Sequence, residues 1–546
     1  MKQLTMQQSS YTKVSSYEAR EGEVKKVVLL YSGGLDTSVM LKWIKEKYQA
    51  EVIALTMDLG QQGDDLQAIK AKGLKLGAKK VYMIDAKDEF AEEYLAPLIK
   101  ANGSYQGNYH ISTISRYLMA KWVIAVAARE KADAAAHGCT GKGNDQVRID
   151  SSILALEPKM KIIAPVREWD MSRDEEIDYA LKNKIPVPVK KDFPYSSDDN
   201  MWGITWEGGE IEDPALIPQA HRFLMGTRII EKTPNKPEFI KLEFRKGLPF
   251  KLNGKAYKLA ELIMKLNEIG GKHGVGVVHH LEDRLVGLKS RGVYEHPGGH
   301  VIIEAHRNLE KYVCTRLENE LKETMDIKFG YLCYAALWFD PAMDDIRAFN
   351  DKINEKVDGI VTVKLFKGNT TVVAMESPHG LHHASFDNND NRATSFNVMN
   401  SAPFIEVYSL QMRLAQQRAE KSALLSIGKE ANKKKLLPLM KKLSQLGYQL
   451  FATEKTHQFL IEQGVSNFLV YKISEKQKPN LGALLNEKRF DLIVNIPTST
   501  GDKKESTDGQ LIRQKAIDSN VPLYTTVDTV KRQIEKMHQA KFGDLE

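Results

Sequence analysis

Apolar runs of strand length alternate with helical patterns along the first third of the chain. The run "KKVVLLY", which begins at Lys25, is followed by "LDTSVMLKWIKEKY", in which apolar residues recur at helical spacing. The alternation continues through the strand-like "EVIALTM", "KKVYMID", "ADAAAHG" and "KMKIIAP" and the helical "DDLQAIKAKGLKLG" and "SRYLMAKWVIAVAAREK". Strands separated by helices predict an α/β fold, with a parallel sheet covered on both faces. Ligands of such sheets bind beyond the carboxyl ends of the strands.

The pattern changes near residue 190. The segment "IPVPVKKDFPYSSDDN" is polar and rich in proline, which predicts a domain junction. Beyond it, "EFIKLEF", "LPFKLNG" and "IVTVKLFKGNTTVVAME" read as antiparallel strands, and "AELIMKLNEIGG" reads as a helix between them. We therefore expect an α+β second domain. The segment "FIEVYSLQMRLAQQRAEK" predicts a helix that leaves this domain near Gln417.

A third alternating pattern begins at Ser422. Five short strands, "ALLSIG", "YQLFAT", "NFLVYK", "DLIVNIP" and "PLYTT", are separated by helical or loop segments, which predicts a compact α/β domain. The expected organisation is a disordered leader at 1–22, a nucleotide-binding domain at 23–190, a second domain at 191–400, a helix and linker at 401–420 and a third domain at 421–546.

Composition adds few constraints. Hydrophobic residues make up 42% of the 546 residues and charged residues 27%, as in ordinary globular proteins. The polar amino terminus lacks the apolar core of a secretory signal, and no window approaches ~18 uninterrupted apolar residues. The three cysteines are too scattered for a disulfide framework or a zinc site, so we expect a cytoplasmic protein. The net charge of +7 is spread among acids without a basic stripe, which favours small anionic substrates over nucleic acid or membrane partners.

The first strand runs into a glycine-containing loop, in "VVLLYSGGLDTSV". Gly33 and Gly34 allow close approach of a ligand, and Ser32, Thr37 and Ser38 supply hydroxyl groups. The following helix presents free N–H groups and the positive end of its dipole, so the loop is suited to phosphate oxygens. It matches neither the Walker A motif nor the G-x-G-x-x-G fingerprint. The structural alternative is a plain turn between strand and helix.

A second loop, "HGCTGKGNDQVR" at residues 137–148, combines three glycines with polar groups of every kind. Arg148 can bind a carboxylate, Asp145 an ammonium group, and Asn144 either of them. The loop is therefore suited to a zwitterion. A solvent-exposed surface loop is the alternative.

The quoted motifs resemble known families. The loop S-G-G-x-D-[TS]-S resembles that of the N-type ATP pyrophosphatases (adenine nucleotide alpha hydrolase-like proteins). Together with "HGCTGKGNDQVR", the blocks "IPVPV", "PYSSDDNMWGITWEGG", "GGKHGVG" and "EDRLVGLKSRGVYE" resemble the argininosuccinate synthase family over roughly residues 25–418. The resemblance implies a homotetrameric ligase of arginine biosynthesis and the urea cycle. It would join citrulline to aspartate through a citrullyl-adenylate, releasing AMP and diphosphate.

The resemblance also implies site residues. ATP would be bound, with Mg²⁺ held indirectly by Asp36, at Leu30, Tyr31, Ser32, Gly33, Gly34, Leu35, Asp36, Thr37, Ser38, Met57 and Gly138. Aspartate would be bound by Thr140, Asn144 and Asp145, and citrulline by Tyr109, Thr113, Asn144, Arg148, Ser196, Thr205, Glu282 and Tyr294. The chain departs from the family pattern at Cys139, Thr205 and Asp283. At Thr113, two alignments with the family that differ by one residue are open.

The last 125 or so residues resemble a different family. The segments "LLSIGKEANKKKL", "GYQLFATEKTHQFLIEQGV", "DLIVNIPTSTG" and "IRQKAIDSNVPLYTTVDT" resemble the methylglyoxal synthase-like domain, most closely the regulatory domain of carbamoyl phosphate synthetase. This implies a small anionic allosteric effector, bound by Lys433, Thr453, Thr456, Asn495 and Thr498. Lys472 and Gly509 depart from the animal relatives, and a domain that only packs or oligomerises is the alternative. "ATEKT" and "NIPTSTG" lack the context of methylglyoxal synthase catalysis.

Two other functions are alternatives to a regulated synthase. An RNA-modifying adenylase such as a tRNA thiolase shares the ATP loop, but it predicts cysteine pairs and a basic RNA-binding module. A catalytically silent sensor predicts erosion of the first loop, whereas "SGGLDTS" is intact.

Overall fold

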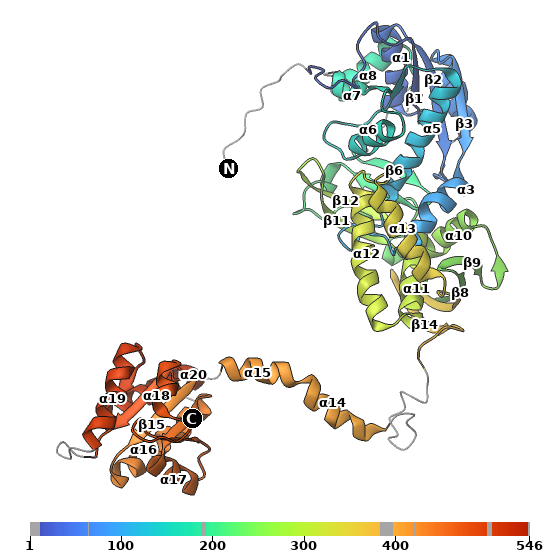
Figure 1. Cartoon of the computed structure of the whole chain (residues 1–546). Coiled ribbons are helices and arrows are strands. Elements are labelled where there is room, and N and C mark those ends of the chain that lie inside the picture. Colours follow the sequence, from blue (N-terminus) through green and yellow to red (C-terminus); the bar gives the residue numbers. More distant parts are fainter. Residues whose placement is uncertain are drawn as a thin grey trace. The chain divides into compact units, whose positions relative to one another are not determined.

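The computed structural model describes residues 11–543 except 64, 170, 172, 187–192, 383–396, 420 and 499–504. The chain divides into two compact units, residues 1–387 and 388–546, which are described one at a time (Figure 1). The expected boundaries at 190/191 and 420/421, and the first ten residues of the expected leader, lie outside the described residues.

The first unit begins with a five-stranded parallel sheet in the order β3-β2-β1-β4-β5. Its strands are β1 (Lys26–Leu30), β2 (Glu51–Asp58), β3 (Lys80–Asp85), β4 (Ala134–Ala136) and β5 (Lys161–Ile163). The sequence-based prediction of a parallel sheet is confirmed. The order reverses between β1 and β4, so their carboxyl ends flank a crevice where such sheets bind ligands.

Helices cover both faces of this sheet. Along β1, Val27 and Leu29 join the core cluster that contains Leu41 of α1, whereas Val28 joins the cluster that contains Val123 of α5. This is the period of two that a strand buried on both faces requires. The covering helices include α1 (Leu35–Tyr48), α2 (Leu66–Lys75), α5 (Ser115–Glu130) and α6 (Asp145–Leu156), and α8 (Arg173–Lys182) packs against α1.

The second part of this unit is α+β, as predicted. One antiparallel sheet has the order β11-β12-β7-β6 and another the order β10-β9-β8-β13-β14. The first contains β6 (Ser196–Asn200), β7 (Gly203–Glu207), β11 (Val277–Asp283) and β12 (Lys289–Glu295). The second contains β8 (Glu238–Arg245), β9 (Leu248–Leu252), β10 (Lys255–Ala256), β13 (Gly359–Phe366) and β14 (Asn369–Glu376). The long helices are α10 (Leu259–Lys272), α11 (Pro297–Val313), α12 (Arg316–Tyr334) and α13 (Pro341–Asn354).

The two parts of the first unit share one apolar core. A single cluster of buried residues includes Ile53 of β2, Trp202 between β6 and β7, and Leu309 of α11. A close-packed interior has low compressibility, so the two parts that share it have little freedom to move relative to one another. Side chains contributed by the two parts therefore keep defined positions relative to one another.

The expected disordered leader is wrong for part of its length. The Ala19 N–H donates to the Ile162 carbonyl at 3.0 Å, and the Ile162 N–H donates to the Tyr17 carbonyl at 2.9 Å. Ala19 is fully buried. Strand β5 lies at the edge of the sheet, so the N–H and C=O groups on its outer side need partners other than a strand of this sheet. Residues 17–19 provide these hydrogen bonds. The ordered chain therefore begins before residue 23.

A buried charge at Ala19 should detach this segment. We expect Ala19→Asp to lower the free energy of unfolding by about 2–4 kcal/mol, because a carboxylate in this place is desolvated without a partner. Val14→Asp is the matched control, since Val14 is 85% exposed in the same segment. Denaturant titration of the two variants measures the difference, and equal midpoints would contradict the packing described for Ala19.

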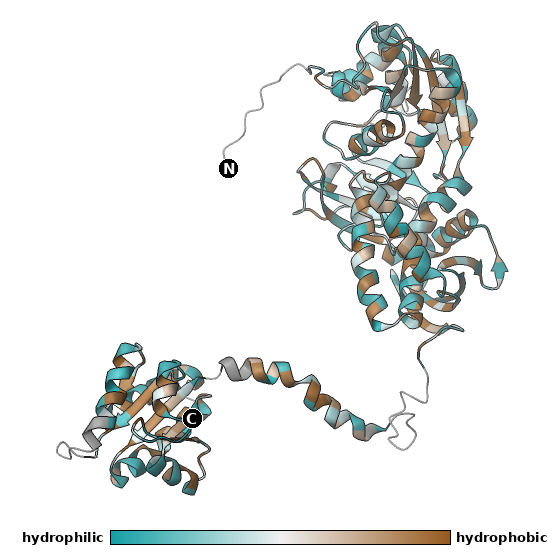
Figure 2. Cartoon of the chain, in the orientation of Figure 1, coloured by the Kyte–Doolittle hydropathy of each residue, from teal (hydrophilic) through white to brown (hydrophobic). Residues whose placement is uncertain are grey.

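The second unit contains α14 (Ser401–Tyr408) and α15 (Leu410–Ala419), where the sequence predicts one helix. The described apolar side chains of these helices, among them Phe404, Val407 and Met412, are exposed. Figure 2 shows the hydrophobic residues along both helices. Among the helices of the described residues, none is long and apolar enough to cross a membrane.

The rest of this unit is a second parallel sheet, in the order β17-β16-β15-β18-β19. Its strands are β15 (Ser422–Ile427), β16 (Gln449–Thr453), β17 (Phe468–Val470), β18 (Leu492–Ile496) and β19 (Leu523–Tyr524), so each of the five predicted strands is found. The helices are α16 (Glu430–Gln445), α17 (Glu454–Glu462), α18 (Leu481–Asn486), α19 (Glu505–Asp518) and α20 (Val527–Phe542). Separate core clusters fill the two faces.

Candidate functional site

A cavity of about 730 Å³ opens at the carboxyl ends of β1, β2 and β4. It contains many of the residues that the sequence assigned to ATP. Those on its lining are Leu30, Tyr31, Ser32, Gly33, Gly34, Thr37, Met57 and Gly138. The cavity therefore lies at the predicted edge of the sheet and is formed by the predicted loop.

The glycine loop has the geometry of an anion site. Gly33 has φ +77°, and a Cβ there would lie 2.9 Å from Cγ1 of Ile69, so a larger residue would be both strained and crowded. Gly34 is the N-cap of α1, so the free N–H groups of this helix open toward the cavity that Gly34 lines. The Ser32 and Thr37 hydroxyl oxygens lie 3.1 Å apart beside them.

Three other residues assigned to ATP are absent from the described lining. Ser38 is fully buried and its hydroxyl lies 3.4 Å from that of Tyr31, so it supports the loop from inside. Leu35 packs into an apolar cluster with Val39. Asp36 lies exposed in the first turn of α1.

Two cations that the sequence analysis did not single out also line the cavity. Lys72 of α2 donates to the Gly33 carbonyl at 2.7 Å, and burial lowers the pKa of its amine. Arg116 of α5 is largely buried. Both supply positive charge near the place where phosphates would lie. Arg116 occurs in the helical segment "SRYLMAKWVIAVAAREK", whereas the sequence around Lys72 has no motif that could have revealed it.

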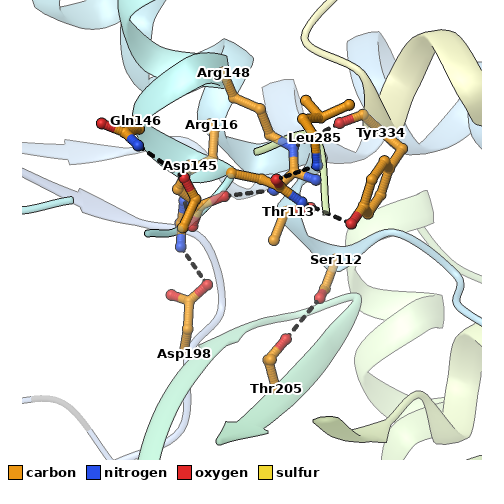
Figure 3. A network of polar contacts seen from close by, with 12 residues as sticks. Ser112, Thr113, Arg116, Asp145, Gln146, Arg148, Asp198, Thr205, Leu285 and Tyr334 are labelled. Atoms are coloured by element: carbon orange, nitrogen blue, oxygen red, sulfur yellow. Dashed lines mark hydrogen bonds and ion pairs between the residues drawn. The ribbon is translucent and has the colours of Figure 1, made fainter. Parts of the chain in front are cut away.

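A chain of charged side chains connects the cavity to the second loop (Figure 3). Arg116 Nε donates to Asp145 Oδ2 at 2.9 Å, and its Nη2 forms an ion pair with Asp198 of β6. Arg148 Nη1 donates to the other oxygen of Asp145 at 2.6 Å. Burial raises the pKa of Asp145, but the two arginines outweigh it and lower the pKa to about 2. The carboxylate therefore stays ionised at neutral pH.

Arg148 retains one buried donor without a partner. Its Nε donates to the Tyr334 carbonyl at 3.1 Å and its Nη1 to Asp145. Among the described residues, its Nη2 has no hydrogen-bond partner. A buried guanidinium nitrogen in this state favours an external acceptor such as a carboxylate.

A group of hydroxyl-bearing side chains forms the neighbouring wall (Figure 3). The Tyr109 hydroxyl donates to Thr113 Oγ1 at 3.2 Å, and Ser112 Oγ lies 3.2 Å from Thr205 Oγ1. The Tyr109 and Tyr294 rings are in contact, with centroids 4.3 Å apart. Residues assigned to citrulline from three separate segments thus meet at one place. Ser112 belongs to this group as closely as Thr113 does, which is consistent with an alignment open by one position.

Two assigned residues lie outside these contacts. Thr140 and Ser196 are exposed, at the start of the second loop and of β6 respectively. The cavity is lined instead by Ser197 and Asp198, which lie within the quoted block "PYSSDDNMWGITWEGG".

Cys139, a departure from the family pattern, also lines the cavity. Its backbone N–H donates to His137 Nδ1 at 3.2 Å, and His137 Nε2 lies 2.6 Å from Asp150 Oδ1. The imidazole therefore holds the backbone of the cavity wall between β4 and the second loop.

The residues assigned to the effector meet at the carboxyl edge of the second parallel sheet. Lys433 Nζ donates to the Lys455 carbonyl at 2.6 Å, and the fully buried Thr456 accepts from the Ile427 N–H at 3.2 Å. Asn495 Oδ1 accepts from Arg513 Nη1 at 2.9 Å, a cation that the sequence analysis did not identify. The other two are close by, since Thr453 begins α17 and the Thr498 backbone approaches Gly428 at the end of β15.

Comparisons with family models cover most of the chain. The model of the arginosuccinate synthase N-terminal HUP domain matches residues 26–186, and that of the arginosuccinate synthase C-terminal domain matches residues 195–415. The MGS-like domain model matches residues 435–525.

Curated relatives agree with these models. The argininosuccinate synthase of Dictyoglomus turgidum is 46% identical over 402 residues, 73% of this chain and 100% of that protein. The argininosuccinate synthase of Pyrococcus furiosus is 47% identical over 391 residues, 71% of this chain and 94% of that protein. A solved U34-tRNA thiolase from Methanococcus maripaludis aligns with a TM-score of 0.21 at 19% identity, over 30% of this chain and 60% of that one, which is too weak to carry an argument. By its family models and its relatives, the chain belongs to the argininosuccinate synthase family and carries an MGS-like domain after the synthase domains.

Proposed function

We propose that this chain is a cytoplasmic ligase that joins L-citrulline to L-aspartate at the expense of ATP. The ureido oxygen of citrulline attacks the α-phosphorus of ATP, forming an O–P bond as diphosphate leaves. The aspartate amine then attacks the ureido carbon of the citrullyl-adenylate and expels AMP, which yields argininosuccinate. The chemistry needs positioning and charge stabilisation more than a covalent catalyst.

The glycine loop and its cations support the assignment of ATP. Gly33, Gly34 and the start of α1 provide N–H donors, and Lys72 and Arg116 provide positive charge on the same cavity. ATP enters such sites with Mg²⁺, which prefers carboxylate and phosphate oxygens as ligands. The exposed carboxylate of Asp36 fits that role.

The observation that carries the assignment of amino-acid substrates is Arg148 Nη2, a buried donor without a hydrogen-bond partner in the part of the chain that the structure describes. We assign this nitrogen to the citrulline carboxylate, with Glu282 and Asn144 beside it to bind the ammonium group. The hydroxyl-bearing wall of Tyr109, Thr113 and Thr205 would surround the rest of the substrate. Asp145 and the second loop would receive aspartate between citrulline and ATP.

The exposed apolar helices α14 and α15 support a homotetramer. Phe404, Ile405, Val407 and Tyr408 are each more than 60% exposed, which is costly for an isolated helix in water. Burial against another copy of this chain would remove that cost.

The proposed reaction is tested by product formation. Purified full-length protein with Mg-ATP should release diphosphate only when citrulline is present, and argininosuccinate should accumulate once aspartate is added. Enzyme-coupled diphosphate detection and mass spectrometry measure the two products. Turnover on tRNA without turnover on citrulline would reverse the assignment.

The glycine loop can be tested separately. We expect Gly33→Ala to weaken ATP binding about tenfold or more, because the added Cβ meets Ile69 and displaces the loop. Gly254→Ala is the matched control, since Gly254 has φ +82°, close to that of Gly33, but an added Cβ meets no atom within 4 Å. Calorimetry with ATP compares the variants, and equal affinities would argue against the loop as the phosphate site.

We further propose that the MGS-like domain binds a small anionic effector at the edge of its sheet. Lys433, Thr453, Asn495 and Thr498 converge there, and Arg513 adds a second cation. Binding that changes the synthase activity would be an allosteric coupling, typically of about 1–3 kcal/mol.

Matched lysine variants test the effector site. In the full chain, inorganic phosphate, nucleotides, N-acetylglutamate and arginine are screened for a change in rate or melting temperature. We expect Lys433→Met to raise the half-maximal concentration of an active compound about tenfold or more, since a buried ammonium partner is lost. Lys434→Met should respond as the wild type does, because the Lys434 side chain is 69% exposed. A panel without effect, or an equal response of the two variants, would contradict the effector proposal.

A further inference from the structure

Tyr334, the last residue of α12, lies at the point where the segments of the proposed citrulline site meet (Figure 3). Its side chain is fully buried, and its ring stacks on that of Tyr105 with centroids 3.5 Å apart. The Tyr109 ring meets it edge-on at 6.5 Å. Neither the motifs of the sequence nor the assigned site residues include this tyrosine.

The Tyr334 hydroxyl determines how Asn144 is oriented. A phenol has one hydrogen, and both the Glu282 Oε2 atom at 2.8 Å and the Asp283 carbonyl at 3.2 Å can only accept it. The hydroxyl oxygen therefore accepts from Asn144 Nδ2, 2.6 Å away. The other end of this amide, Oδ1, accepts from the Leu285 N–H at 2.8 Å. The nitrogen of Asn144 thus faces Tyr334 and its oxygen faces Leu285.

Tyr334 also constrains Arg148. Its backbone carbonyl, at the negative end of α12, accepts from Arg148 Nε at 3.1 Å, and its ring centroid lies 4.8 Å from the Arg148 guanidinium carbon. Asp145 holds Nη1 at the same time. These contacts fix the plane of the guanidinium so that Nη2 is the donor that remains for a ligand.

We propose that Tyr334 is a positioning residue for citrulline, the substrate whose carboxylate is assigned to Arg148. Its hydroxyl holds Asn144 and Glu282 in the orientation that receives the substrate, and its carbonyl and ring hold Arg148. The inference rests on the proposed function, since Asn144, Arg148 and Glu282 are the groups assigned there to citrulline. It adds a residue from α12, an element to which no substrate contact is assigned.

Replacement of the hydroxyl tests this role. Tyr334→Phe keeps the ring, the stacking and the backbone carbonyl, but leaves Asn144 Nδ2 and Glu282 without their partner. We expect KM for citrulline to rise about tenfold, while KM for ATP changes less than about twofold. A residue that only supported the fold would alter both constants together or neither. Steady-state kinetics with each substrate varied in turn measures the difference.

Tyr331→Phe is the matched control. Tyr331 lies one turn earlier on α12 and is 45% exposed, so loss of its hydroxyl should leave both constants unchanged. An active wild type with an unaffected Tyr334→Phe variant would overturn this inference alone. A wild type without ligase activity would overturn the proposed function and this inference with it.

A second variant guards against misfolding of Tyr334→Phe, which leaves the Glu282 carboxylate buried without the hydroxyl. The double variant Tyr334→Phe/Glu282→Gln has no carboxylate at this position, and it is compared with Glu282→Gln alone. We expect KM for citrulline to rise a further severalfold in the double variant, because Asn144 still loses its acceptor. An unchanged KM in this comparison would overturn the inference.

Discussion

The proposed site depends on the ionised carboxylate of Asp145 held between two buried arginines. A buried guanidinium is costly without a counter-charge, and Asp145 provides one for Arg116 and Arg148 at once. The arrangement determines which nitrogen of each arginine remains for other partners. Arg116 uses its Nη2 to form an ion pair with Asp198 in the α+β part of the unit. Arg148 has its Nη2 left as a donor without a partner among the described residues. One carboxylate thereby joins the nucleotide cavity to the neighbouring polar site.

The shared core gives this network its precision. Asn144 and Arg148 belong to the parallel-sheet part of the first unit, whereas Glu282 and Tyr334 belong to the α+β part. Their contacts cross between the two parts, over one continuous apolar cluster. A close-packed interior has low compressibility, so such contacts keep defined distances. Because these side chains have defined positions, ordinary polar groups are sufficient for a reaction that depends on positioning.

The second unit has the same arrangement of polar groups at the edge of its sheet. In both parallel sheets, polar side chains and glycines follow the carboxyl ends of the strands, where helix N-termini also lie. The first sheet adds Lys72 and Arg116, and the second adds Lys433 and Arg513. Cations at each edge favour anions, consistent with a triphosphate in one unit and a small effector in the other.

The sequence by itself determined the sheets, the glycine loop and part of the cavity lining, because local periodicity and the freedom of Gly33 are properties of short segments. Through family motifs, it also assigned Glu282 and Tyr294 to citrulline. Only the tertiary structure decided which loops meet, since a contact between residues some 190 positions apart, such as Asn144 and Tyr334, has no local signal. For the same reason, the edge pairing of Ala19 and the roles of Lys72 and Tyr334 appear only when the folded chain brings their partners together.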